Sequence, residues 1–183
     1  MARDRFQATN RGRGVVLALC LIACPLWFVT SVSAAARSPA AVTARPPAPA
    51  TRVTTLDGRS IDLAALQGRV VIVDFWATWC PPCLAEIPHF KALYATYHPR
   101  VEILAIAVDN EGESVVAPFV RQQGITYPVI LGHDGKLAAA YGGIRGLPTT
   151  FVIDRRGRIY KKYVGYQAPE VFERDVTALL AES

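Results

Sequence analysis

Cysteine is scarce in this sequence of 183 residues, which contains only four. Cys20 and Cys24 lie in an apolar run near the N-terminus, so only Cys80 and Cys83 remain for the rest of the chain. A framework of structural disulfides needs more cysteines than that, so a disulfide-stapled fold is excluded. In an oxidising compartment, two cysteines separated by two residues are more typical of a redox couple.

Ligands for a metal ion are also few. A structural zinc site usually needs four ligands, and the histidines, His89, His98 and His133, show no paired ligand spacing. We therefore expect neither a metal nor another cofactor in this protein. One alternative stays open, because the thiols of Cys80 and Cys83 are soft ligands that suit Cu(I).

The excess of positive charge is concentrated at the start of the chain. Lys and Arg outnumber Asp and Glu by 20 to 15, but residues 1–36 hold four Arg against one Asp. Residues 37–183 are nearly balanced at 16 to 14. They give no basis for a nucleic-acid partner.

The N-terminus has the pattern of an export signal or a membrane anchor. Four arginines precede an apolar run over residues 15–32, and small residues follow at 33–36. The run is longer than the roughly 7 to 15 residues of a cleaved signal and close to the roughly 17 to 25 that span a bilayer. We favour an uncleaved anchor within the segment 1–36, with cleavage near residues 34–36 as its rival and lipidation at Cys24 as a weaker third interpretation. With an anchor or a signal, the rest of the chain lies outside the cytoplasm.

Residues 37–50 are rich in Pro and Ala and show no apolar period, which predicts an extended linker. One domain is expected over residues 51–183. It opens with a hairpin signal at Asp57-Gly58. Apolar runs that predict strands then alternate with segments of helical spacing. We expect strands over 70–77, 101–109, 127–131, 149–154 and 158–166, and helices over 81–97, 113–124, 136–141 and 169–181. This α/β order, with a hairpin and a helix at its end, predicts a mixed central sheet covered by helices on both faces.

The stretch DFWATWCPPCLAEIPHF, residues 74–90, carries the candidate chemistry. Cys80 ends a strand and precedes a helix, where the helix dipole and free backbone N–H groups favour a thiolate. Cys83 lies one turn into the same helix and can attack a mixed disulfide at Cys80, so we expect Cys80 to be the nucleophile and Cys83 the resolving thiol. Pro81 and Pro82 lack N–H groups. They should therefore weaken the stabilisation of the thiolate, which favours a reductant.

Two acidic residues and a tryptophan accompany the cysteines. Asp74 interrupts an apolar strand, so we expect a buried carboxyl with a raised pKa that accepts the proton of Cys83; the alternative is an outward-facing strand residue. Glu86 follows Cys83 by three residues and lies on nearly the same helix face. It either tunes the titration of the sulfurs or is a solvated helix residue. Trp79 is expected to cover the sulfurs or to contact substrate.

Three separated motifs resemble the thioredoxin superfamily, specifically its membrane-anchored TlpA, ResA and DsbE-like branch. They are TLDG (55–58), VVIVDFWATWCPPCLAEIP (70–88) and GLPTTFVIDRRGRI (146–159). The resemblance covers residues 51–183 and implies a thioredoxin-like fold with an inserted strand and helix between residues 101 and 124. It also implies a cis Leu147–Pro148 bond facing the redox pair, beside which a substrate chain pairs as an added strand.

Both acidic residues have counterparts in this resemblance. Glu86 falls where the branch carries an active-site acid. Asp74 matches ordinary thioredoxins, whereas relatives in the branch often have an uncharged residue there. The division of labour between the two acids is therefore open.

The resemblance implies an extracytoplasmic thiol-disulfide oxidoreductase that reduces disulfides in client proteins and is kept reduced by a membrane electron donor. It suggests apocytochrome c or copper-site assembly proteins as clients, and no segment of this sequence selects between them. Three alternatives remain. They are a thiol oxidase, which differs only in redox potential, a Cu(I) chaperone, and a peroxidase on a related fold, which the position of the cysteine pair at a helix start disfavours.

Overall fold

A five-stranded mixed sheet lies at the centre of the structure, a computed structural model that describes residues 45–182. In spatial order its strands are β5 (Val129–Leu131), β4 (Val101–Ala107), β3 (Val70–Trp76), β6 (Thr149–Ile153) and β7 (Ile159–Val164). β3 pairs in parallel with β4, and β4 with β5, whereas β6 is antiparallel to both β3 and β7. The mixed sheet predicted from the sequence is confirmed.

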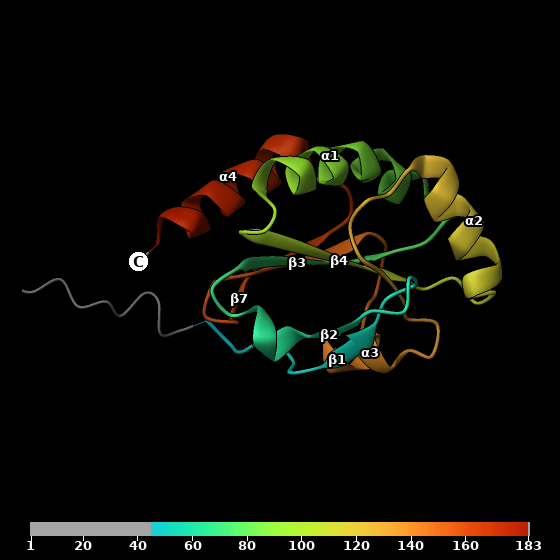
Figure 1. Cartoon of the computed structure of the whole chain (residues 1–183), viewed down its shortest axis with the longest axis horizontal. Coiled ribbons are helices and arrows are strands. Elements are labelled where there is room, and N and C mark those ends of the chain that lie inside the picture. The colour runs from blue at the N-terminus through green and yellow to red at the C-terminus, as the bar shows by residue number, and fades with distance from the viewer. Residues whose placement is uncertain (1–44, 183) are drawn as a thin grey trace, which may run out of the picture. The chain divides into compact units, whose positions relative to one another are not determined.

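Both faces of this sheet are covered (Figure 1). Helices α1 (Pro81–Tyr97), α2 (Glu113–Gln123) and α4 (Pro169–Ala181) lie over one face. The opposite face carries the hairpin of β1 (Arg52–Thr54) and β2 (Ser60–Asp62), the 3-10 helix η1 (Leu63–Leu66) and the short helix α3 (Lys136–Ala140). The thioredoxin-like arrangement with its N-terminal hairpin agrees with the expectation.

A separate apolar core lies on each side of the sheet, and β3 contributes to both. Successive side chains of a strand point to opposite faces. Ile72 and Trp76 accordingly join the core beneath α1, α2 and α4, whereas Val73 and Phe75 join the core beneath the hairpin and α3. Asp74 has the parity of Ile72 and Trp76. Its carboxyl group therefore faces α1, the helix that begins with the cysteine pair.

Element boundaries differ from the expected ones by a few residues. The structure ends β4 at Ala107, two residues before the predicted end. It begins β5 at Val129 rather than at Tyr127, since Pro128 has no N–H to donate to a strand ladder. Helix α4 begins and ends at the predicted residues.

Residues 45–50 pack against the domain and do not extend away from it as a free linker. Their contacts are the Ile159 N–H to the Pro46 carbonyl (2.8 Å), the Ala48 N–H to the Gly157 carbonyl (2.9 Å), and ion pairs from Arg45 to Asp154 (3.0 Å) and Glu182 (2.8 Å). The packed structure therefore begins upstream of Thr51, the residue at which the composition predicted the start of the domain. The backbone carbonyls of a Pro- and Ala-rich segment can still accept hydrogen bonds, and the amino-acid composition does not reveal such contacts.

The expected anchor at 15–32, the cleavage site at 34–36 and residues 37–44 of the expected linker lie outside the described residues. None of the helices formed by residues 45–182 combines the length and the hydrophobicity needed to span a bilayer.

Candidate active site

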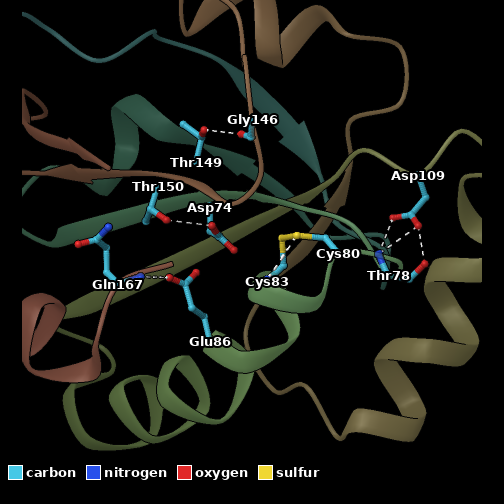
Figure 2. The surroundings of a disulfide bond; sticks show 10 residues. All are labelled: Asp74, Thr78, Cys80, Cys83, Glu86, Asp109, Gly146, Thr149, Thr150 and Gln167. Carbon is cyan, nitrogen blue, oxygen red and sulfur yellow. Dashed lines mark hydrogen bonds between the residues drawn. A yellow bond between two sulfur atoms is a disulfide. The ribbon is translucent and has the colours of Figure 1, made fainter. Parts of the chain in front are cut away.

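Cys80 and Cys83 form a disulfide where the chain passes from β3 into α1, with an S–S distance of 2.05 Å (Figure 2). Cys80 is the N-cap of α1, and its Sγ accepts a hydrogen bond from the backbone N–H of Cys83 at 3.4 Å. Pro81 and Pro82 occupy the first two helical positions and have no N–H to offer to this sulfur. The N–H of Cys83 is therefore the first donor of the helix that Cys80 can use.

A surface groove of about 590 Å³ leads to the disulfide, and its lining includes Cys80 but not Cys83. Both residues are largely buried, with 4 % of Cys80 and 2 % of Cys83 exposed. A reactant in the groove thus meets Cys80 first. The two sulfurs are chemically alike but differ in access.

The groove is apolar with a basic component. Trp79 stands at its rim and is 65 % exposed. Ile144 and Leu147 add apolar surface, and His133 and Arg145 are exposed basic residues in the same lining. Trp79 is therefore an exposed aromatic side chain in the lining that also holds Cys80.

The Leu147–Pro148 bond is cis, and Leu147 lines the same groove as Cys80. The carbonyl of Pro148 accepts a hydrogen bond from the Gly165 N–H (2.8 Å), which ties this loop to the end of β7. Within residues 45–182, no hydrogen bond involves the backbone N–H or carbonyl of Leu147. These two backbone groups are therefore unpaired within the described residues.

Asp74 is buried in β3 and faces α1, as the apolar strand around it predicted. One carboxylate oxygen accepts a hydrogen bond from the Thr150 hydroxyl at 3.0 Å. Burial raises the pKa of Asp74 to about 8, and the negative charge of Glu86 adds to this rise, while the Thr150 hydrogen bond opposes it. Near neutral pH the carboxyl group is therefore largely protonated and can exchange a proton.

Glu86 is also buried and is not the solvated helix residue of the alternative interpretation. Its Oε1 accepts a hydrogen bond from the backbone N–H of Gln167 at 2.8 Å, and its Oε2 has no hydrogen-bond partner in the part of the chain that the structure describes. Burial raises the pKa of Glu86 to about 7, against the lowering effect of the Gln167 N–H. Two carboxyl groups that titrate near neutrality thus lie between the sheet and α1.

Figure 2 shows the two acidic residues on the Cys83 side of the disulfide, with Asp74 coming from the sheet and Glu86 from α1. The groove, with Trp79 and Leu147, reaches the pair through Cys80. The disulfide therefore separates an accessible side from a buried acidic side.

Asp109, which sequence reasoning did not select, holds the loop that carries Cys80. It follows β4 and is buried, and its carboxylate accepts hydrogen bonds from the backbone N–H of Thr78 (3.1 and 3.2 Å) and from the Thr78 hydroxyl (Figure 2). Thr78 lies two residues before Cys80. An acidic residue closing an apolar run was the available signal. Arg145 was also missed, because nothing in the local sequence marks its place in the groove.

Comparisons with known proteins agree with this geometry. A model of the Redoxin family matches residues 43–180. The thiol-disulfide oxidoreductase ResA of Bacillus anthracis is 39 % identical over 122 residues, which cover 66 % of this chain and 69 % of the relative. ResA of Halalkalibacterium halodurans is 38 % identical over 129 residues, 70 % of this chain and 72 % of the relative.

Solved structures show the same fold. The crystal structure of a thiol:disulfide interchange protein of the thioredoxin family from Chlorobium tepidum has a TM-score of 0.69 and 38 % identity, and it covers 75 % of this chain and 97 % of that one. A secreted disulfide oxidoreductase of Mycobacterium tuberculosis, described as homologous to E. coli DsbE, has a TM-score of 0.62 and 26 % identity, with 71 % and 96 % covered. The chain therefore belongs to the Redoxin family, as a thiol-disulfide oxidoreductase related to ResA that acts on disulfide-containing client proteins.

Proposed function

We propose that this oxidoreductase reduces client disulfides outside the cytoplasm, with Cys80 as the nucleophile and Cys83 as the resolving thiol. The observation that carries the assignment is the difference in access: the groove is lined by Cys80 and not by Cys83. A thiolate that cannot meet the client disulfide cannot open it. Cys83 can, however, reach Cys80, since the two sulfurs are bonded in the structure.

The reaction consists of two exchanges. In the reduced protein the Cys80 thiolate attacks one sulfur of the client disulfide, so that a Cys80–client bond forms, the client S–S bond breaks and one client thiolate leaves. Cys83 then loses its proton and attacks Sγ of Cys80. The Cys80–Cys83 bond forms, the mixed disulfide breaks and the second client thiolate leaves. Two electrons pass from the protein to the client, which gains two thiols.

The ionised form of Asp74, a minority near pH 7 that grows as the pH approaches 8, is the proposed acceptor of the Cys83 proton. Asp74 lies on the Cys83 side of the pair, and burial places its pKa near 8, close to the ordinary thiol value of about 8.5. Glu86 acts on this base through its charge, because it raises the pKa of Asp74. Glu86 is thus a positioning and tuning residue for the transfer.

The prolines favour the direction of electron flow toward the client. Without N–H groups at Pro81 and Pro82, the Cys80 thiolate has fewer donors, and a poorly stabilised thiolate makes a dithiol a better reductant. A reductant in an oxidising compartment must be reduced again. We propose a dithiol donor in the membrane for this step and the segment 15–32 as the anchor. Apocytochrome c and copper-site assembly proteins are the clients to test first.

The client surface extends to both sides of Leu147. An extended segment of the client would pair with the free backbone groups of Leu147 as an added strand. Besides Trp79, the large apolar side chains most exposed in residues 45–182 are Val164 and Tyr166. Val164 is the register partner of Thr149, directly after Pro148. Exposed apolar residues therefore flank the cis-proline loop, as expected of a protein-binding surface.

Trapping in the compartment where the protein acts tests the two cysteine roles. Cys83→Ser should accumulate mixed disulfides between Cys80 and clients, because the resolving thiol is missing. Cys80→Ser should trap almost none, and the double serine variant sets the background. Equal trapping by both single variants would overturn the assignment.

The midpoint potential of the Cys80/Cys83 pair tests the direction. A value near or below about −200 to −230 mV, the range of glutaredoxins, agrees with a reductant. A value approaching about −120 mV would instead make the protein a thiol oxidase.

A further inference from the structure

The groove beside Cys80 carries charge of one sign. Apart from Cys80, the ionisable residues that line it are His133 and Arg145, and no Asp or Glu of residues 45–182 lines it. The remaining lining is apolar or glycine, with Trp79 and Leu147 as its largest side chains. An anionic group entering the groove would therefore meet Arg145 and His133 and no acidic side chain of the described lining.

Arg145 is available to such a group. It is exposed and lies two residues before Leu147. Among residues 45–182, no hydrogen bond or ion pair joins its side chain to another residue. Other arginines of the domain are engaged: Arg45, Arg52 and Arg69, for example, each pair with an acidic residue. The charge of Arg145 is thus not neutralised within the domain.

Acidic residues on the neighbouring elements are occupied or directed elsewhere. Asp134 forms an ion pair with Lys136 at 3.0 Å, and its negative charge also interacts with the neighbouring His133. Asp109 is buried and accepts the hydrogen bonds of Thr78. Glu113 lines crevices beside the β1 strand and not the groove. Gly112, between Glu111 and Glu113, also lies against the His133 ring. The positive charge of the groove that no described acidic residue pairs with is therefore that of Arg145.

We infer that the groove selects client segments that carry acidic side chains within a few residues of the cysteine to be reduced. The inference rests on the proposed function, because it assigns the groove to the client of Cys80. A client chain paired with Leu147 runs past Arg145, so side chains near its cysteine come close to the guanidinium group. Apolar neighbours such as Trp79 and Leu147 would cover the segment and reduce the exposure of that ion pair to water.

The test uses small peptide disulfides as probes. Blocked peptides of the form Gly-x-x-Cys-x-x-Gly are prepared as disulfide-linked dimers in which the positions two residues from Cys are Glu, Gln or Lys. The protein used is the full chain, kept in detergent and reduced beforehand. Each rate constant is divided by that of the same peptide with dithiothreitol, whose attacking thiolate carries the same charge as the Cys80 thiolate, which cancels the effect of peptide charge on thiolate attack and on the leaving thiol.

The expected order of the normalised rate constants is Glu above Gln above Lys. Each step should be about 2- to 5-fold, the range that an exposed ion pair gives, and it should shrink at 1 M salt, where charges are screened within about 3 Å. Arg145→Gln should flatten the order, and Arg145→Glu should reverse it. Arg121→Glu is the matched control: it makes the same charge change at an exposed residue that lines a different crevice, and it should keep the wild-type order.

Each other outcome is decisive. Equal normalised rates for the three peptides, or a preference that survives Arg145→Glu, would overturn the inference while the oxidoreductase function stands. If Arg121→Glu lost the preference for acidic peptides to the same extent, that preference would depend on the net charge of the protein. The role of Arg145 would then also be overturned. If the reduced wild-type chain opened none of the three peptide disulfides, the proposed function itself would fail.

Discussion

Asp109 holds Thr78 across neighbouring strands, with both carboxylate oxygens close to the Thr78 backbone N–H and one accepting its hydroxyl. Because Cys80 follows two residues later, this buried contact fixes the start of the redox loop to the end of β4.

Removing this contact should destabilise the domain in a coupled way. Asp109→Ala leaves the N–H and the hydroxyl of Thr78 without their acceptor, and because Thr78 is half-buried the total cost should be about 1 to 3 kcal/mol. Thr78→Val should cost about 1 kcal/mol alone and much less in the Asp109→Ala background, since its partner is already missing. Urea unfolding of the four proteins in the double-mutant cycle measures the coupling. Additivity within about 0.5 kcal/mol would show that the contact contributes nothing.

Asp74→Asn should stabilise the oxidised protein, and more so at high pH. The folded state raises the pKa of Asp74 from 3.8 to about 8, so folding retains a proton that the unfolded chain has lost. Wild-type stability therefore falls, relative to the variant, as pH rises from about 4 to about 8, and the difference is constant above that. It should reach a few kcal/mol, at about 1.4 kcal/mol for each unit of pKa. Urea unfolding at pH 5, 7 and 9 measures it.

The control for this experiment is Asp57→Asn. Asp57 is exposed, and its pKa is lowered, chiefly by the Thr55 hydrogen bond, so it stays ionised across the range. Its stability difference from wild type should be the same at pH 5 and pH 9. A flat difference for Asp74→Asn as well would show that the pKa of Asp74 is not raised by folding.

Glu86→Gln should lower the pKa of Asp74. The negative charge of Glu86 contributes to raising that pKa to about 8, and Gln keeps an oxygen that can accept the Gln167 N–H. The titration of the Asp74 carboxyl carbon, followed by NMR in the oxidised protein, should therefore move to lower pH. Glu173→Gln, at an exposed acidic residue on α4, should leave the titration unchanged. An unchanged or higher Asp74 pKa in Glu86→Gln would mean that the two carboxyl groups do not interact.

Pro82→Ala should make the protein a weaker reductant. It supplies a backbone N–H at the second helical position, from which an N-cap side chain can accept. A hydrogen bond to a charged group contributes about 1.5 to 3 kcal/mol, so the midpoint potential should rise by about 30 to 60 mV. Pro88→Ala is the control, because it removes a proline from the same helix away from its start. A potential that rises equally in both variants would assign the effect to the helix and not to the missing donor.

The sequence predicted an element well where apolar residues recur with one period between residues that mark its start and its end. Helix α4 begins at Pro169 and ends at Ala181 as expected, because a proline opens it and its apolar residues recur at helical spacing. The strand containing Asp74 was also predicted, and with it the burial of that carboxyl group, since apolar residues surround it on both sides.

The tertiary partners could not be predicted in the same way. Glu86 looks like any exposed glutamate of a helix until Gln167, 81 residues later, closes over it. Asp109 and Thr78 meet because β3 and β4 are neighbours in the sheet, and Arg145 enters the groove through a loop without regular structure. Such contacts depend on how the elements assemble, and no local pattern encodes them.

The ion pairs of Arg45 place the start of the described chain at one pole of the domain. Arg45 binds Asp154, which follows β6, and the end of β6 pairs with Val71 near the beginning of β3. Cys80 follows the other end of β3, roughly 20 Å away along a seven-residue strand. A pulling force applied through the N-terminus would therefore act first on the ion pairs of Arg45 and not on the redox loop. A domain attached to a surface through its N-terminus would therefore keep the groove beside Cys80 at the end of β3 away from the attachment.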